Sequence, residues 1–487
     1  MEKQEILERG RKIKAALEQQ GGYWAFAPDQ AMQIGPEPFV ISSSDFTAAL
    51  EAGQTVFRFW QEALRVQLAS IRGDLPAWVA ESVEGPLDKA QREWQRKVCL
   101  ESGESALPYL ARLDCTSLWY PVEIQERLGF LGGCASWHMA NDEAGYPDGI
   151  SPLGGGNIPL ALAAAFRNIA GLSCPRVLLV SPKGYLVEQN FLRYQLEVQG
   201  ILSAVIDRDE LLTGVGLAAA NGKITVNSQP IDLIYRRELN AATLAQTEAG
   251  LEILRSCLAG KVAIEPPLNM LYDCKSPMVW VHHPETAKFF SDDVRALIPP
   301  AALLPLSNLE RFRLGSSELT INEIFEFSND KRTFVIKYAG PSIEYGFGGR
   351  AVYSLACTHK RAREIIDDAR NQIWKGHPWI IQPQDHAKYP TWRLEGDSVV
   401  SEEMYARLLF YYSRSDSLFA GQANFNRNWK VAGNKATVFS IICEKGDKKC
   451  VDMMKKNASA GVYDNRGLEG SGTPVSPMGQ RCQKKRG

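Results

Sequence analysis

The sequence lacks features that would place it at once among membrane, secreted or nucleic-acid-binding proteins. Its 487 residues carry 55 Lys and Arg against 56 Asp and Glu, so no excess charge attracts nucleic acid or anionic lipid. No apolar run approaches the roughly 20 residues that cross a bilayer. The longest run, Ile158–Ala165, leads directly into Arg167, and the first 20 residues lack the apolar core of a signal peptide. We therefore expect a cytoplasmic protein without nucleic-acid or membrane partners.

The cysteines also lack the spacing of a metal site. All ten occur singly, no two form a Cys-x-x-Cys pair, and no histidine stands at zinc-finger distance from any of them. We expect small buried hydrophobic side chains at these positions, with a reactive thiol as the alternative at any one of them.

What the sequence does have is enough apolar content, 45% of its residues, for more than one core. Apolar residues three and four apart predict helices in Phe46–Ser70 and Leu87–Val98, whereas short strand-like segments begin near Arg112. We expect an α/β protein in five parts: a helical N-terminal region over 1–110, a hairpin and Gly-rich loop over 111–170, an α/β lobe over 171–265, two lobes over 266–443 and a polar, disordered tail over 444–487.

The segment 171–265 alternates strand-like and helical patterns. Residues 176–180 form a β-branched run suited to a buried parallel strand, and 186–199 are helical. Further strands are expected at 201–206, 223–226 and 231–235. This order predicts a small Rossmann-like sheet.

Lys337 is the first candidate for a functional residue. It ends the β-branched run Phe334-Val335-Ile336, and a loop with glycines at 340, 346, 348 and 349 follows. An ammonium group neutralises phosphate charge, and loop amides without a neighbouring Cβ can close over phosphates. The pattern favours a nucleotide site, and an ordinary hairpin with a lysine reaching for solvent is the alternative.

Two further segments suit a nucleotide. The apolar run Trp379-Ile380-Ile381 leads into Gln382 and Gln384, whose amides can pair with the edge of adenine. A plain junction between strand and loop is the alternative. Lys275, in Asp273-Cys274-Lys275, stands at an expected helix start, where a lysine can meet phosphate.

A charged hairpin is expected in the N-terminal half. Arg112 and Asp114 alternate on one strand, and Glu123 and Gln125 alternate on the next. Antiparallel pairing can bring the four side chains together. Two carboxylates and an amide oxygen are hard ligands of the kind that hold Mg²⁺ between phosphates, although a charged hairpin face without metal is the alternative.

In type and order, these segments resemble the ATP-grasp enzymes. Arg-x-Asp followed by Glu-Ile-Gln is similar to their metal motif Arg-x-Asp…Glu-x-Asn, and the segments of Lys275 and Lys337 resemble those of their two phosphate lysines. GFGGR resembles their mobile lid, and WIIQPQ resembles their adenine hinge. The metal motif precedes the lysines here, as in the circularly permuted branch that includes glutathionylspermidine-synthetase-like proteins. Ile231–Arg237 is also similar to an Asp-hydrophobic-Tyr-Arg-Arg stretch of that branch, so the resemblance spans residues 110–440.

The resemblance implies a circularly permuted ATP-grasp fold that uses ATP and Mg²⁺. The implied reaction joins a small-molecule carboxylate to an amine through an acyl phosphate, with release of ADP and phosphate. The residues that the resemblance assigns to the metal are Asp114, Glu123 and Gln125; those assigned to the nucleotide are Lys275, Lys337, Gly346, Gly348, Gly349, Gln382 and Gln384; those assigned to catalysis are Arg112, Arg236 and Arg407.

Several departures leave other interpretations open. Gln125 replaces the usual Asn, the spacing from Asp114 to Glu123 is short, and the lid carries Glu344 and Tyr345. A catalytically degenerate scaffold that binds nucleotide or a partner is therefore the alternative function.

Three other segments keep two interpretations each. A second alignment would use His138-x-x-Asn141-Asp142-Glu143 as the acidic site. The Gly154–Gly156 loop could bind a substrate carboxylate, or form a helix entry capped by Asn157. Arg237, beside Arg236, could clamp carboxylate or phosphate, or serve in surface pairing.

Overall fold

The computed structural model describes residues 1–20, 32–85, 87–126, 128–214, 217–220, 223–237, 239–341, 351–415, 417–431 and 437–445. Met1–Gly446 form one compact unit with a mixed α/β fold. Except for Glu444 and Lys445, the expected tail lies outside the described residues, as do the three lid glycines Gly346, Gly348 and Gly349.

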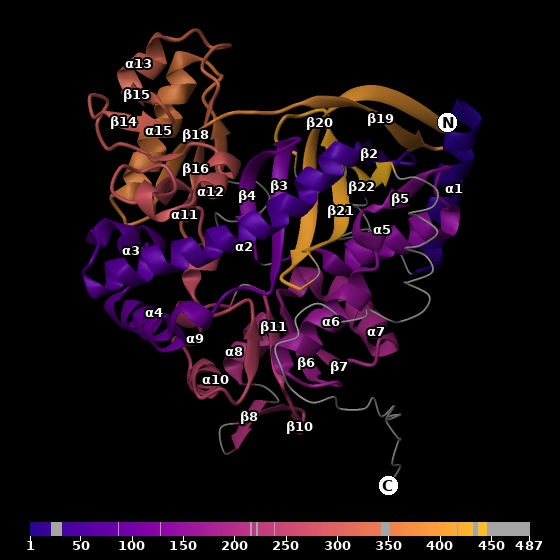
Figure 1. Ribbon diagram of the computed structural model, residues 1–487, viewed down its shortest axis with the longest axis horizontal. Coiled ribbons are helices and arrows are strands. Elements are labelled where there is room, and N and C mark those ends of the chain that lie inside the picture. The colour runs from indigo at the N-terminus through magenta and orange to yellow at the C-terminus, as the bar shows by residue number, and fades with distance from the viewer. Residues whose placement is uncertain are drawn as a thin grey trace, which may run out of the picture. The chain divides into compact units, whose positions relative to one another are not determined.

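The largest sheet combines strands from both ends of the chain (Figure 1). Its central order is β1 (Gln33–Ile34), β22 (Val438–Lys445), β21 (Ser417–Asn426), β20 (Ser398–Ser413), β3 (Leu110–Ser117) and β4 (Tyr120–Gln125). Three more strands pair at its margins: β19 (Lys388–Glu395) with β20, and both β2 (Phe39–Ile41) and β5 (Ile150–Pro152) with β22.

The face of this sheet that lies under helix α2 (Ser43–Arg72) is apolar. Figure 1 shows α2 crossing the sheet. Phe59 and Trp60 of α2 belong to the same core cluster as Phe410 and Tyr412 of β20. Because side chains alternate along a strand, Tyr411, which lies between Phe410 and Tyr412, faces the other side of the sheet. The polar site is built on that side.

Helices cover part of the second face. Helix α1 (Lys3–Gln19), α5 (Leu131–Ala144) and α6 (Ile158–Ala170) pack there on Leu409 and Phe439. The N-terminal region is mostly helical, with α3 (Ala77–Glu84) and α4 (Lys89–Ser102) following α2. The expectation of a purely helical 1–110 is wrong in one respect, because β1 and β2 lie between α1 and α2 and join the large sheet in parallel with β22.

A second, fully parallel sheet has the order β12 (Ala263–Glu265), β11 (Leu233–Arg236), β6 (Arg176–Ser181) and β7 (Leu202–Asp207). Helices α6 and α7 (Leu186–Val198) pack with one face, and α10 (Glu248–Leu258) and α4 contribute to the cluster on the other. The expected strand 223–226 does not continue this sheet. As β9 (Lys223–Val226), it pairs with β8 (Leu217–Ala220) and β10 (Gln229–Pro230) instead.

A third lobe has its own core. Its sheet has the antiparallel order β13 (Ala302–Leu303), β18 (Trp379–Pro383), β16 (Phe334–Tyr338) and β17 (Val352–Ser354). Helices α13 (Ile321–Glu326) and α15 (His359–Ile373) pack with it, beside the hairpin of β14 (Phe312–Leu314) and β15 (Ser317–Leu319). The remaining short helices are α8 (Arg208–Thr213), α9 (Ala241–Leu244), α11 (Pro277–Trp280) and α12 (Asp292–Leu297).

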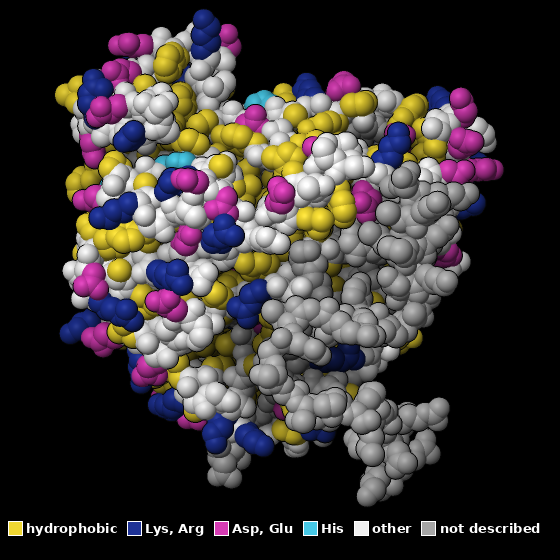
Figure 2. Space-filling view, viewed as in Figure 1, with side chains coloured by type: hydrophobic (Ala, Val, Ile, Leu, Met, Phe, Trp, Pro, Cys, Tyr) yellow, Lys and Arg dark blue, Asp and Glu magenta, His cyan; other side chains and the backbone are white. Residues whose placement is uncertain are grey.

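The surface is mixed in charge. Figure 2 shows Lys and Arg interspersed with Asp and Glu over the visible face, in line with the near-zero net charge. Within the described ranges, no helix combines the length and the apolar character that a bilayer crossing needs.

Candidate active site

A cavity of about 290 Å³ lies where the large sheet meets the third lobe. The hairpin β3–β4 and the strand β20 supply one wall, and β16 with the segment after β18 supplies another. The residues from the expected site that line this cavity are Arg112, Glu123, Gln125, Lys275, Lys337, Gln384 and Arg407. Segments far apart in the sequence therefore converge on one space.

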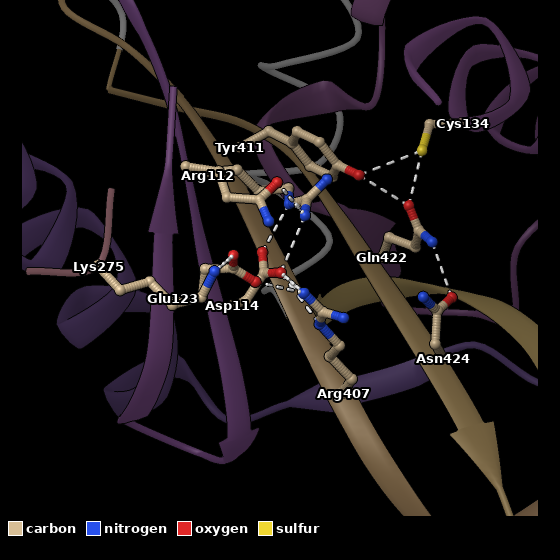
Figure 3. Close-up of polar contacts among 10 residues, drawn as sticks. Arg112, Asp114, Glu123, Cys134, Lys275, Arg407, Tyr411, Gln422 and Asn424 are labelled. Atoms are coloured by element: carbon tan, nitrogen blue, oxygen red, sulfur yellow. Dashed lines mark hydrogen bonds and ion pairs between the residues drawn. The ribbon is translucent and has the colours of Figure 1, made fainter. Parts of the chain in front are cut away.

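Asp114 is the centre of the charged cluster (Figure 3). Pairing of β3 with β4 sets Asp114 opposite Glu123 and Arg112 opposite Gln125. Arg112 donates to both oxygens of the fully buried Asp114, at 2.6 Å from Nε and 2.9 Å from Nη2, and also to Gln125 Oε1 at 2.6 Å. Arg407 of β20 donates to Asp114 Oδ2 from Nε at 3.0 Å. Two guanidinium groups therefore share one buried carboxylate.

Glu123 links this cluster to the segment after β12. Its Oε1 accepts from Lys275 Nζ at 2.6 Å, and its Oε2 accepts from Arg407 Nη2 at 2.9 Å. Burial alone would raise the pKa of Glu123, but Lys275 and Arg407 outweigh it and lower that pKa below its usual range. Glu123 is thus a carboxylate held ionised by two cations.

Lys337 differs from the other cations in its partners. Its Nζ donates to Gln382 Oε1 at 2.7 Å and to the carbonyl of Val122 at 3.2 Å, and both oxygens are uncharged. Burial lowers the pKa of Lys337 to about 7; the charges of Lys275 and Arg407 add to this effect, and Glu123 opposes it. A buried lysine with neutral partners favours an anionic ligand that would restore its charge.

The two hinge amides differ in position. Gln382, on β18, is fully buried, and its Nε2 has no hydrogen-bond partner within the described part of the chain. Gln384 lines the cavity, and its Oε1 accepts from Ser354 Oγ at 2.5 Å. Gln384 is therefore placed to meet a ligand directly, whereas Gln382 acts on Lys337.

The structure separates the two neighbouring arginines at the end of β11, Arg236 as its last residue and Arg237 just after it. Arg236 is fully buried, and its guanidinium donates to the carbonyls of Pro266 (2.7 Å), Pro267 and Leu239. It does not line the cavity and holds the segment after β12 in place. Arg237 does line the cavity.

Arg237 is fixed from two sides. Its Nη1 donates to Glu188 Oε1 at 2.8 Å, and its guanidinium carbon lies 4.1 Å from the ring centroid of Tyr185. Glu188 in turn accepts from the backbone N–H of Gly132 at 2.7 Å. Arg237 thus takes the cavity position that the sequence interpretation gave to Arg236.

A neutral network on the cavity wall was missed from sequence, and its members Tyr411, Gln422 and Asn424 line the cavity. Tyr411 Oη donates to Gln422 Oε1 at 2.8 Å, Cys134 Sγ lies 2.6 Å from that oxygen, and Gln422 Nε2 donates to Asn424 Oδ1 at 2.7 Å (Figure 3). The signal for Tyr411 was available, because Arg407, Leu409 and Tyr411 alternate along β20 and share one face.

Of the segments with two interpretations, the His138 segment and the Gly154–Gly156 loop do not line the cavity. Asn157 Oδ1 accepts from the N–H of Leu160 at 3.1 Å, so Asn157 caps α6. Gly154 has φ +59, and a Cβ there would lie 2.3 Å from the carbonyl oxygen of Leu418, so the Gly loop serves packing. His138 is buried, and its Nε2 lies 3.2 Å from the carbonyl of Gly421, away from any acidic cluster of the cavity.

The donor set Asp114, Glu123 and Gln125 suits Mg²⁺ in chemistry, because all three offer oxygen atoms from adjacent strands. Each of these side chains accepts from Arg112, Arg407 or Lys275, so a metal ion would share them with cations. Across the described ranges, no group of three or more His, Cys, Asp or Glu side chains is arranged to hold a metal by itself. Phosphate oxygens would have to complete the coordination.

Comparison with family models and with curated proteins found no match. Among solved structures, a glutathione synthetase-like effector, GSS30, from Globodera pallida in its apo form has a similar fold. The TM-score is 0.53 at 11% identity, over 91% of this chain and 97% of that chain. At this identity the likeness shows the fold alone.

Proposed function

We propose that this protein is an ATP- and Mg²⁺-dependent ligase with a circularly permuted ATP-grasp fold, which joins a carboxylate to an amine through an acyl phosphate. The observation that carries the proposal is the convergence of Arg112, Lys275, Lys337 and Arg407 on one cavity. With Arg237 and Lys430, the described lining holds six cationic side chains against four carboxylates, those of Glu123, Glu126, Asp273 and Asp385. Such a cationic cavity suits a polyanion such as a triphosphate. The fold shared with a glutathione synthetase-like effector supports the same reading.

Each residue has a separate role in this proposal. Lys337 and Lys275 neutralise the phosphates, and Gln384 contacts the base from the segment after β18. Arg112 and Arg407 stabilise the charge that develops as the carboxylate oxygen attacks the γ-phosphorus and the bond to ADP breaks. The amine then attacks the acyl carbon, phosphate leaves, and the amine loses a proton. Arg237 binds the acid substrate at the opposite end.

Asp114, Glu123 and Gln125 would hold Mg²⁺, which would supply charge neutralisation between the β- and γ-phosphates. Lys275 and Arg407 pair with Glu123, and the nucleotide would bring its own negative charge to both cations. The oxygens of Glu123 would then be available to coordinate Mg²⁺ as well. The cavity contains no arrangement of nucleophile and base in its described lining, in keeping with catalysis by positioning and electrostatics.

A specific observation favours a second candidate, a nucleotide-binding scaffold without turnover. Every predicted metal ligand is already engaged by an arginine or a lysine, and the structural neighbour is named an effector. Both candidates predict nucleotide binding, and only the ligase predicts ADP release that depends on an acid and an amine.

The test is an assay of ADP and AMP release with ATP, Mg²⁺ and pools of small acids, amino acids and polyamines. We expect ADP and phosphate, only with particular pairs. AMP would contradict the acyl-phosphate route. Nucleotide binding without release of either product would favour the scaffold.

Variants then assign the roles. Glu123→Gln keeps the shape of the side chain and should lower turnover by about 100-fold or more, since it weakens both the metal site and the hold on Lys275. The matched control is Lys288→Gln, whose parent lysine is exposed on an unrelated turn beside Phe289. Unchanged turnover in Glu123→Gln would remove Glu123 from the metal site.

A further inference from the structure

A second cavity, of about 310 Å³, lies between α4, α6, α10 and β12. In the described part of the chain it shares no lining residue with the candidate active site. Its volume is at the lower end of the range of roughly 300–1,000 Å³ that ligand sites occupy, which suits a small metabolite.

Glu265 is the acidic group of this cavity. Its side chain is buried, with 2% of the residue exposed, and its Oε1 accepts from the N–H groups of Tyr109 at 2.8 Å and Leu110 at 3.0 Å. Its Oε2 has no partner in the described ranges. Burial raises the pKa of Glu265 to about 7, although these two hydrogen bonds and the charges of Arg414 and Arg236 oppose the shift. A buried carboxylate with an unpartnered oxygen in a cavity wall favours a donor or cation from a ligand.

Arg414 is the basic group of the same cavity. Its guanidinium carbon lies 5.3 Å from the ring centroid of Tyr109, and its backbone N–H donates to the carbonyl of Tyr109 at 2.8 Å. Within the described residues its side chain has no carboxylate partner at ion-pair distance. The hydroxyl of Tyr109 accepts from Asn168 Nδ2 at 2.8 Å, which fixes the ring that supports Arg414.

The rest of the wall combines apolar and polar side chains. The apolar ones include Val98, Leu107, Ile169, Leu258, Ile264 and Leu268, and the polar ones include Ser102, Ser105 and Asn168. The cavity therefore offers one negative group, one positive group and an aliphatic stretch of wall in a small volume.

We propose that this second cavity binds a free α-amino acid with an apolar side chain, its ammonium on Glu265 and its carboxylate on Arg414. An amine alone would leave Arg414 without an anion, and a simple carboxylic acid would meet Glu265 with like charge. A zwitterion satisfies both, and its apolar side chain contacts the aliphatic wall. The binding is reversible and involves no covalent step.

Calorimetric titration of the full chain with leucine tests the proposal, and two analogues serve as chemical controls. N-acetyl-leucine lacks the ammonium group, and leucinamide lacks the carboxylate. We expect leucine to bind, and each analogue to bind at least about tenfold more weakly, because each loses one charge-assisted contact. Failure of leucine to bind, or equal binding of either analogue, would overturn the proposal.

Two variants place the site. Glu265→Gln keeps an oxygen for Tyr109 and Leu110, and both it and Arg414→Gln should weaken leucine binding about tenfold or more. Arg313→Gln, on the exposed hairpin of the third lobe, is the matched control and should bind leucine like the wild type. If Glu265→Gln does not fold, Arg414→Gln and the two analogues decide. If leucine instead bound in the active site as an amine substrate, Arg414→Gln would leave its affinity unchanged. An unchanged affinity in Arg414→Gln would therefore also overturn the proposal.

Discussion

At the scale of single residues, the charge on Lys337 is the variable part of the site. Arg112, Arg407 and Lys275 each contact a carboxylate, so their charges are compensated. Among the described residues, the Nζ of Lys337 donates to the oxygens of Gln382 and Val122 and to no carboxylate, and burial lowers the pKa of Lys337 to about 7. Above neutral pH, Lys337 is therefore mostly uncharged until a ligand brings negative charge to it.

Nucleotide binding should accordingly take up a proton at Lys337 above pH 7. Phosphate raises the pKa of Lys337, so affinity should fall by up to about tenfold per pH unit between pH 7.5 and 9. Titrations of ATP in buffers of different ionisation enthalpy measure the proton uptake, and Lys337→Gln should abolish it. Uptake that persists in Lys337→Gln would place the proton elsewhere.

The same shift affects stability in the absence of ligand. Between about pH 7 and the ordinary value of 10.5, the unfolded chain binds a proton at Lys337 that the folded protein does not. The contribution of Lys337 to the free energy of unfolding therefore rises with pH between about pH 7 and 10.5, and it is lowest below about pH 7.

The two carboxylates of the cluster should differ in their effect on stability. Asp114→Asn leaves the buried Arg112 and the partly exposed Arg407 side by side without their shared anion, and should cost about 3–5 kcal/mol in the free energy of unfolding, mostly through Arg112. Glu123→Gln should cost less, since its residue is partly exposed and its cations can turn toward solvent. Urea denaturation of both variants measures the difference. Equal losses would show that Asp114 is not the centre of the cluster.

At the scale of elements, the contact of α5 with the start of α7 positions Arg237. A Cβ at Gly132 would lie 2.0 Å from the carbonyl oxygen and 2.8 Å from Oε2 of Glu188. Gly132→Ala should therefore separate the two helices, cost about 1–3 kcal/mol of stability, and displace the glutamate that holds Arg237. Gly184→Ala is the control, because nothing lies within 4 Å of a Cβ there. Thermal unfolding of both variants tests this contact. Wild-type-like stability in Gly132→Ala would contradict it.

Sequence patterns predicted elements whose determinants are local. Alternation correctly placed Arg112 and Asp114 on one strand face and Glu123 and Gln125 on another, and the pairing of β3 with β4 brings the four together. The β-branched run ending at Lys337 is a strand. Alternation could not show that Arg237 rather than Arg236 reaches the cavity, because the choice depends on the backbone carbonyls that Pro266 and Pro267 present from the segment after β12. The metal and nucleotide roles of these residues stay predictions.

At the scale of the molecule, the site depends on pairings that no local pattern reveals. Strands β1 and β2 near the N-terminus pair with β22 near residue 440, and β3 pairs with β20 almost 300 residues later. The cavity then forms where three parts of the chain meet: the large sheet and the segment of Lys275, which share one hydrophobic core, and the lobe of Lys337, which has a core of its own. A ligand in the cavity touches all three, so its binding energy would hold them together.

Nucleotide should therefore stabilise the whole unit. At 100 times its dissociation constant, MgATP should add about 2.7 kcal/mol to the free energy of unfolding and raise the melting temperature. Lys337→Gln should reduce that shift, and omission of Mg²⁺ should reduce it if Asp114 and Glu123 share a metal with the phosphates. The shift requires binding but no turnover, so it is expected of both ligase and scaffold. An unchanged melting temperature at millimolar MgATP, together with unchanged calorimetric heats, would contradict nucleotide binding and with it both candidate functions.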